Sequence, residues 1–119
     1  MGRPHQDLDA WKEAMRMAKM VYQVSQDFPR EEVYGLTSQV RRAAVSVPSN
    51  LSEGAARSSR KEFSHFLSVA KGSLSELETQ LMISADLGYL PIDHDIFAQL
   101  ERVAQLLGGL HRKVSSRAN

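Results

Sequence analysis

Residues 60–87, RKEFSHFLSVAKGSLSELETQLMISADL, decide the fold. Apolar or small residues recur through this stretch at alternating steps of four and three: Phe63, Leu67, Ala70, Leu74, Leu77, Leu81 and Ser84. That spacing is typical of the contact face of a helical bundle or a coiled coil. Ser59 and Glu62 have the spacing of a capping box, and Gly88 follows in the position of a helix C-cap. We therefore predict one helix over residues 60–87, about 42 Å long at 1.5 Å per residue.

The N-terminal residues predict a helix over 8–27 with a wider apolar surface. Two rows follow helical spacing: Leu8, Trp11, Met15, Ala18 and Tyr22 in one, and Ala14, Met17, Val21, Val24 and Phe28 in the other. Two neighbouring rows are typical of a helix that contacts more than one partner. Asp7 is placed to cap this helix. The Phe28-Pro29 step ends it, because a residue before proline avoids the α region.

Another helix is predicted between these two, from residue 36 onward. Its apolar positions are Leu36, Val40, Ala43, Ala44, Val47 and Leu51. Pro48 interrupts this helix, so that it either stops near Ser46 or kinks and continues to about Glu53. We favour the kink, because Ser49, Asn50 and Ser52 can satisfy the loosened backbone groups. Gly54 is then expected to end the helix.

The C-terminal residues predict a fourth helix that Asp93 caps. Its apolar positions are Ile96, Leu100, Val103, Leu107, Leu110 and Val114. Four helices with short links predict an all-α, antiparallel up-and-down four-helix bundle. We expect a single domain over residues 1–119, with an ordered core at about 7–114 and a frayed tail at 115–119.

Composition excludes several classes of protein. The chain has 119 residues, a formal net charge of +1 and no cysteine. A disulfide scaffold, a thiolate metal site and a cysteine nucleophile are therefore excluded together. No apolar run approaches the roughly 20 residues that span a bilayer, and the N-terminus lacks a signal-peptide pattern. We expect a cytoplasmic protein without a membrane partner.

Signals of catalysis are weak. Ser58 and Lys61, and also Ser68 and Lys71, have the serine–lysine spacing of some hydrolases, but the companion motifs are missing. No two of the four histidines have the four-residue spacing of a helical zinc site. We therefore expect no enzymatic activity, no cofactor and no metal.

Charge is unevenly distributed along the chain. Residues 36–75 contain six Lys or Arg and two Glu, whereas residues 76–101 contain six Asp or Glu and no Lys or Arg. One interpretation is a basic region that meets phosphate. The candidate nucleic-acid contacts are Arg41, Arg42, Arg57, Arg60 and Lys61. The alternative is that these charges only solvate the outer faces of the helices.

A polar stripe follows helical spacing on the predicted helix that begins at residue 36 and contains Pro48. Its members are Gln39, Arg42, Ser46, Asn50 and Glu53. Small residues around the stripe allow another backbone to approach closely. The stripe is a candidate subunit interface, because a hydrogen-bonded polar set suits a contact that fixes specificity. An ordinary exposed face and a ligand-lining face are the alternatives.

Residues 34–54, YGLTSQVRRAAVSVPSNLSEG, resemble the signature of the four-helix-bundle proteins that are also called 23S ribosomal RNA intervening-sequence proteins. The motifs DLxAW at 7–11, EFxxFLxxAxGSxxEL at 62–77 and LGYL at 87–90 support the resemblance. It implies a bacterial cytoplasmic protein, a left-handed bundle and a ring-shaped homopentamer. A distant structural relative, the accessory protein of diversity-generating retroelements, is a basic pentamer that associates with nucleic acid and a reverse transcriptase. The resemblance carries over no catalytic residue.

These observations lead to one main hypothesis, a non-enzymatic bundle that assembles into a ring-like homo-oligomer and acts as an RNA- or DNA-associated scaffold. The alternative is a protein–protein adaptor that binds a partner protein in or on the ring without nucleic acid. A hydrolase that uses the polar stripe is the third hypothesis. An adaptor would need an exposed apolar patch, and an enzyme would need a pocket with a strongly perturbed acid or base.

Overall fold

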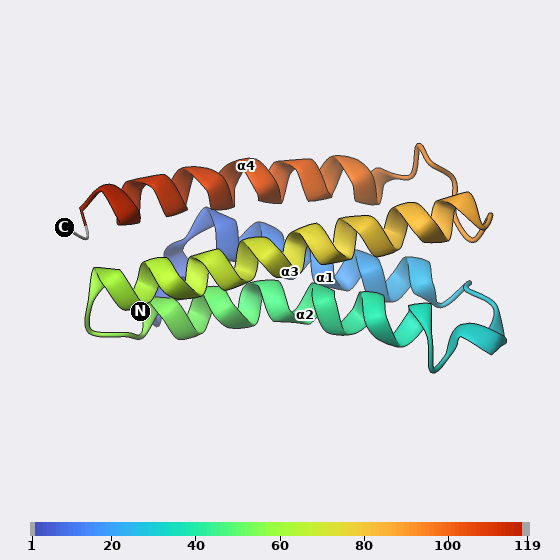
Figure 1. Ribbon diagram of the computed structural model, residues 1–119, viewed down its shortest axis with the longest axis horizontal. Helices are drawn as coiled ribbons and strands as arrows, with labels where there is room; N and C mark the ends of the chain where they lie inside the picture. The colour runs from blue at the N-terminus through green and yellow to red at the C-terminus, as the bar shows by residue number, and fades with distance from the viewer. Residues whose placement is uncertain (1, 118–119) are drawn as a thin grey trace.

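The computed structural model describes residues 2–117 and consists of four long helices (Figure 1). The helices are α1 (Asp9–Ser25), α2 (Leu36–Ala55), α3 (Arg60–Asp86) and α4 (Asp95–Ser116), with 3-10 turns η1 (Pro4–Asp7) and η2 (Arg30–Glu32). No strand occurs within residues 2–117. Successive helices run in opposite directions along a body of 46 × 23 × 22 Å. The all-α four-helix prediction is confirmed, whereas the handedness of the bundle stays a prediction.

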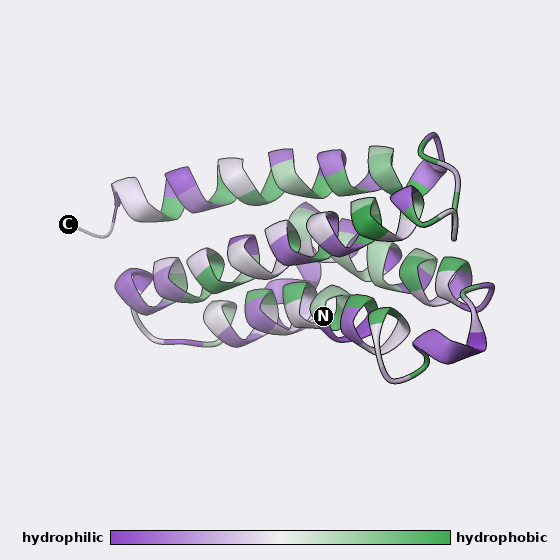
Figure 2. Ribbon diagram, turned by 45° about the vertical axis from the view of Figure 1, so that its right-hand side comes forward, coloured by the Kyte–Doolittle hydropathy of each residue, from purple (hydrophilic) through white to green (hydrophobic). Residues whose placement is uncertain are grey.

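The core lies where the four helices face one another. Each helix packs on its neighbours in the chain, and α4 returns to pack on α1. Figure 2 shows apolar residues on the inward faces and polar residues on the outward faces. The predicted α3 contact face is buried from Leu67 to Ser84, and only Phe63 at its start is half-buried. The alternating spacing therefore identified the core side of α3 correctly.

Helix α2 continues past Pro48, as predicted, whereas the kink at Pro48 stays a prediction. The Asn50 side-chain amide donates to the Ser46 carbonyl at 2.8 Å, and the Ser52 hydroxyl donates to the Ser49 carbonyl at 2.9 Å. The prediction that Gly54 ends the helix is wrong, because α2 extends to Ala55. Gly54 is buried, and a Cβ atom there would lie 2.7 Å from the Cβ atom of Phe66 on α3. Its function is close packing between helices.

Two predicted N-caps are wrong. Asp7 belongs to the turn η1, and Leu8 is the N-cap residue of α1 without a side-chain hydrogen bond. Helix α4 begins at Asp95, and its N-cap is His94, whose Nδ1 accepts from the Ile96 amide at 3.0 Å. Asp93 is one residue too early to reach that amide.

The expected start and end of α3 are largely confirmed. The Ser59 hydroxyl oxygen accepts from the Glu62 amide at 3.1 Å. The Glu62 carboxylate accepts from the Ser59 hydroxyl at 3.2 Å and not from the Ser59 backbone amide, so only half of the capping box forms. Gly88 has φ of +85°, which is the left-handed conformation expected of a glycine C-cap. Helix α4 continues to Ser116, beyond the predicted core limit at 114, and residues 118–119 lie outside the described residues.

Candidate functional site

The two apolar rows of α1 lie in different environments. The row that ends at Phe28 lies in the core, and Ala14, Met17 and Val21 in it are fully buried. The row with Trp11 and Met15 instead faces a groove between α1 and α2. The first row therefore builds the core, while the second packs against the core at Trp11 and Ala18 and is exposed at Met15 and Tyr22.

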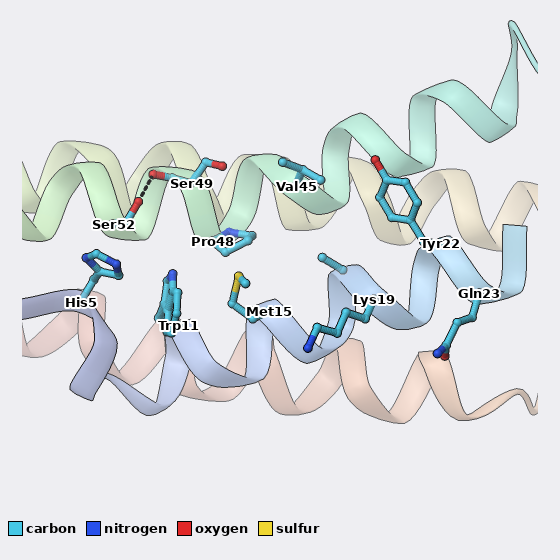
Figure 3. Close-up of a pocket in the computed structure, with 11 residues that line it drawn as sticks. His5, Trp11, Met15, Lys19, Tyr22, Gln23, Val45, Pro48, Ser49 and Ser52 are labelled. Carbon is cyan, nitrogen blue, oxygen red and sulfur yellow. Dashed lines mark hydrogen bonds between the residues drawn. The ribbon is translucent and has the colours of Figure 1, made fainter. Parts of the chain in front are cut away.

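The groove has a volume of about 600 Å³ and runs along α1 and α2 (Figure 3). Trp11, Met15 and Tyr22 line it from α1, and Val45 and Pro48 line it from α2. Met15 is 37% exposed, Val45 42% and Tyr22 43%. Large apolar side chains that gather on one open face are the composition of a packing surface.

Both ends of the groove are held in place by aromatic contacts. At one end, the ring of His5 packs edge-on against Trp11 with ring centres 5.0 Å apart. At the other end, the Arg41 guanidinium lies 4.7 Å from the centre of the Tyr22 ring. The Nε of Arg41 also donates to the Ser25 hydroxyl at 2.8 Å. These contacts fix the groove as a preformed surface.

The structure places the polar stripe of α2 partly inside the bundle. The hydroxyl groups of Ser46 and Ser73 lie 2.8 Å apart across the contact of α2 with α3, and Asn50 bonds to Ser46. Gln39, Arg42 and Glu53 are exposed. The guanidinium of Arg42 donates weakly to Ser38 at 3.4 Å, and the carboxylate of Glu53 pairs with Arg57 at 2.8 Å. Within one chain, Arg42 and Glu53 are not brought together.

A polar hollow of about 410 Å³ lies on the stripe between α2 and α3. Gln39, Arg42 and Ser46 line it from α2, and Glu76 and Gln80 line it from α3. The side-chain oxygen of Gln80 is buried without a hydrogen-bond partner. Sequence analysis did not connect Glu76 and Gln80 with the stripe, because their proximity depends on the stagger of α2 against α3.

The five candidate nucleic-acid contacts form two groups. Arg57, Arg60 and Lys61 lie together at the link between α2 and α3. The Arg57 guanidinium covers the Phe66 ring at 4.8 Å from its centre. Arg41 and Arg42 lie near the opposite end of α2, about 24 Å away along the helix axis. The five candidates therefore lie in two places, as the sequence indicated, and their contact with nucleic acid stays a prediction.

Opposite charges gather at opposite ends of the bundle. The basic end comprises residues 2–9, 53–62 and 111–117, which contain seven Lys or Arg and four Asp or Glu. The acidic end comprises residues 27–35 and 86–95, which contain six Asp or Glu and one Arg. Because α3 is 27 residues long, about 40 Å separates the two ends. The acidic end does not face the cluster at the α2–α3 link.

A serine–histidine contact joins α3 to α4 and was not predicted. Nε2 of His111 lies 3.3 Å from the Ser64 hydroxyl, and Nζ of Lys71 lies 3.3 Å from Nδ1 of His111. Burial, and secondly the Lys71 charge, lower the pKa of His111. Ser64, Lys71 and His111 thus form a polar cluster between α3 and α4.

Two further features of the described residues bear on site chemistry. Within residues 2–117, no three His, Cys, Asp or Glu side chains gather as metal ligands would. No helix in the same range has the length and apolar character needed to cross a membrane.

Comparison with known proteins identifies the family. No curated protein sequence matches the chain significantly. A sequence profile described as 23S rRNA-intervening sequence protein matches residues 6–109, from the turn before α1 into the second half of α4. The matched region includes the α1–α2 groove, the polar hollow and the basic link. The chain belongs to the 23S rRNA-intervening sequence protein family.

Proposed function

We propose that this protein is a non-enzymatic helical bundle whose copies join head to tail into a ring-like homo-oligomer. The observation that carries the proposal is the α1–α2 groove, in which Met15, Tyr22 and Val45 offer exposed apolar surface. Burial of such surface against another chain is the main driving force of association. The pentamer that the family resemblance implies is the assembly we expect.

A head-to-tail contact needs two different patches on each subunit. The groove supplies one patch, and the polar hollow with Arg42 and Gln80 supplies the other. Polar groups on a neighbouring copy that pair with Gln39, Arg42 and Glu76 would fix the register of the contact. Helix α2 lies between the two patches, so one helix serves both contacts.

Light scattering tests this assembly. We expect a mass several times 13.3 kDa for the natural chain at micromolar concentration. Met15→Glu places a charge in the groove and should reduce the mass to that of one chain without loss of helical signal. Ala104→Glu on the outer face of α4 is the matched control and should keep the full mass. A natural chain that scatters as a monomer, or a Met15→Glu variant that assembles normally, contradicts the proposal.

Association with nucleic acid through the basic end is the second candidate function. Arg57, Arg60 and Lys61 would form a repeated band in a ring, so that weak phosphate contacts add through avidity. The family description refers to 23S rRNA, which makes a 23S rRNA fragment the first probe. We expect binding that discriminates little among sequences and, on duplex DNA, weakens with a salt slope near −0.9 per phosphate neutralised.

The triple variant Arg57→Ala, Arg60→Ala, Lys61→Ala decides this point. It should lose most of the affinity for labelled RNA and duplex DNA at low salt while the mass of the assembly stays unchanged. Arg30→Ala, which removes an exposed cation at the opposite end of the bundle, is the control for charge alone. If the triple variant binds as the natural chain does, the protein–protein adaptor becomes the better description.

A further inference from the structure

Four large apolar side chains on two loops at the acidic end are exposed. Tyr34 is 96% exposed, Ile92 65%, Leu87 55% and Val33 50%. Val33 and Tyr34 lie between η2 and α2, and Leu87 and Ile92 lie between α3 and α4. We call these four residues the loop patch. Both loops lie at the same end of the bundle, on the right in Figure 1.

The two loops are fixed to each other by Tyr89. Its hydroxyl donates to the Glu32 carboxylate at 2.8 Å, and its ring lies 5.5 Å from the ring of Phe28. The second oxygen of Glu32 accepts from the Leu36 amide at 3.1 Å and so holds the start of α2. The loop patch therefore lies on a preorganised scaffold, which lowers the cost of ordering when a partner binds.

A cleft of about 410 Å³ opens beside the patch, between the end of α1 and the loop that leads into α4. Met20 and Val24 form its apolar wall, and Asp27 and Asp95 supply carboxylates. Within residues 2–117, no Lys or Arg forms a salt bridge with any carboxylate of the acidic end. An apolar wall with free carboxylates suits a Lys or Arg side chain, whose aliphatic stem packs while its charged tip is paired.

We propose that the loop patch docks a basic protein segment that carries apolar side chains, with one Lys or Arg in the Asp27–Asp95 cleft. Charge decides the class of partner, because six Asp or Glu against one Arg attract a cationic chain and repel phosphate. The apolar residues supply the anchors, and the carboxylates supply specificity and a fast encounter.

A second copy of this chain fits the loop patch less well than such a segment. The cross-section of the bundle, 23 × 22 Å, gives on the order of 400 Å² per end, about half of what a stable interface buries on each partner. In the basic end, none of the described large apolar side chains is exposed, so it offers nothing to match Tyr34 and Ile92. An extended segment can instead follow the cleft and cover both loops.

Fluorescence anisotropy tests the proposal with the full chain. The probe is a short labelled amphipathic peptide of Lys and Leu, compared with the same peptide carrying Glu in place of Lys. We expect saturable binding of the Lys peptide only. Tyr34→Ser with Ile92→Ser, and separately Asp27→Asn with Asp95→Asn, should each weaken it by about tenfold or more, since each pair removes one part of the contact.

Matched controls separate the loop patch from general effects. Val69→Ser and Glu78→Gln remove an exposed apolar residue and an exposed charge from α3 and should leave the affinity unchanged. Equal binding by all variants, or equal binding of the Glu peptide, overturns the proposal. It is also overturned if the Tyr34→Ser, Ile92→Ser variant loses assembly mass or RNA binding, because the patch would then serve a second copy or RNA.

Discussion

The two sides of α2 show how one helix can both build a fold and remain available to a partner. Toward α3, α2 approaches closely, since Gly54 leaves no room for a Cβ atom beside Phe66 and the Ser46 and Ser73 hydroxyl groups touch. Toward α1, Val45 and Pro48 face an open groove. Small residues allow α2 to pack closely on α3, the first contact, whereas larger residues leave a groove between α2 and α1, the second contact. The first contact is used by folding, and the second is the surface that we propose for assembly.

The largest expected effect comes from blocking the α2–α3 contact at Gly54. In Gly54→Val, the new Cβ atom would lie 2.7 Å from the Cβ atom of Phe66 and 3.0 Å from Cδ1 of Phe63. A Cβ atom is tied to the backbone, so α3 itself must move. We expect a loss of about 3 kcal/mol of unfolding free energy. Thermal melts should show a decrease of about 10 °C or more in Tm.

Gly72 on α3 is the matched control, because nothing lies within 4 Å of a Cβ atom placed there. Gly72→Ala should stabilise the protein by about 0.5–1 kcal/mol through the lower backbone entropy of the unfolded chain. Equal changes for Gly54→Val and Gly72→Ala would mean that α2 and α3 are not closely packed.

A smaller effect is expected at the polar hollow, where Arg42 and Glu53 were predicted to act as a set. Arg42→Ala removes the cation that lines the hollow with Gln80 and should cost the assembled protein about 1–3 kcal/mol. Glu53→Ala removes only an exposed pair with Arg57 and should cost about 0–1 kcal/mol. Melts and light scattering on both variants measure this difference. If neither variant changes the melt or the mass, the stripe is ordinary surface.

The fold followed from the sequence wherever spacing alone decides which side of a helix is buried. Leu67, Leu77 and Leu81 could be assigned to the core because every third or fourth position returns to the same side. Local ends were harder to predict. Aspartate is the better N-cap by preference, yet His94 caps α4 because it stands one residue nearer the first free amides.

The interaction surfaces could be predicted only in part. The two rows on α1 indicated surplus apolar surface, and the groove at Met15 matches that expectation. The function of Gly54 could not be inferred, because glycine serves both to end a helix and to let two helices pack closely. Only the residues of α3 that lie opposite Gly54 distinguish the two functions. The Gln80 hollow and the His111 contact also depend on how far one helix is shifted along another.

The smallest expected effect concerns the α3–α4 contact, which is held by the polar cluster around His111. Burial and Lys71 lower the pKa of His111 below 6.5, so the unfolded chain binds a proton that the folded chain resists. Unfolding free energy should therefore fall as the pH decreases below about 6.5 and should stop falling below the folded pKa. Melts between about pH 7.5 and 5.5 measure this change above the range in which carboxylates titrate. His111→Gln removes the group, so its melting temperature should change less over this interval than that of the natural chain. A natural chain and a variant with the same pH dependence would show that His111 is no harder to protonate in the folded chain than in the unfolded chain.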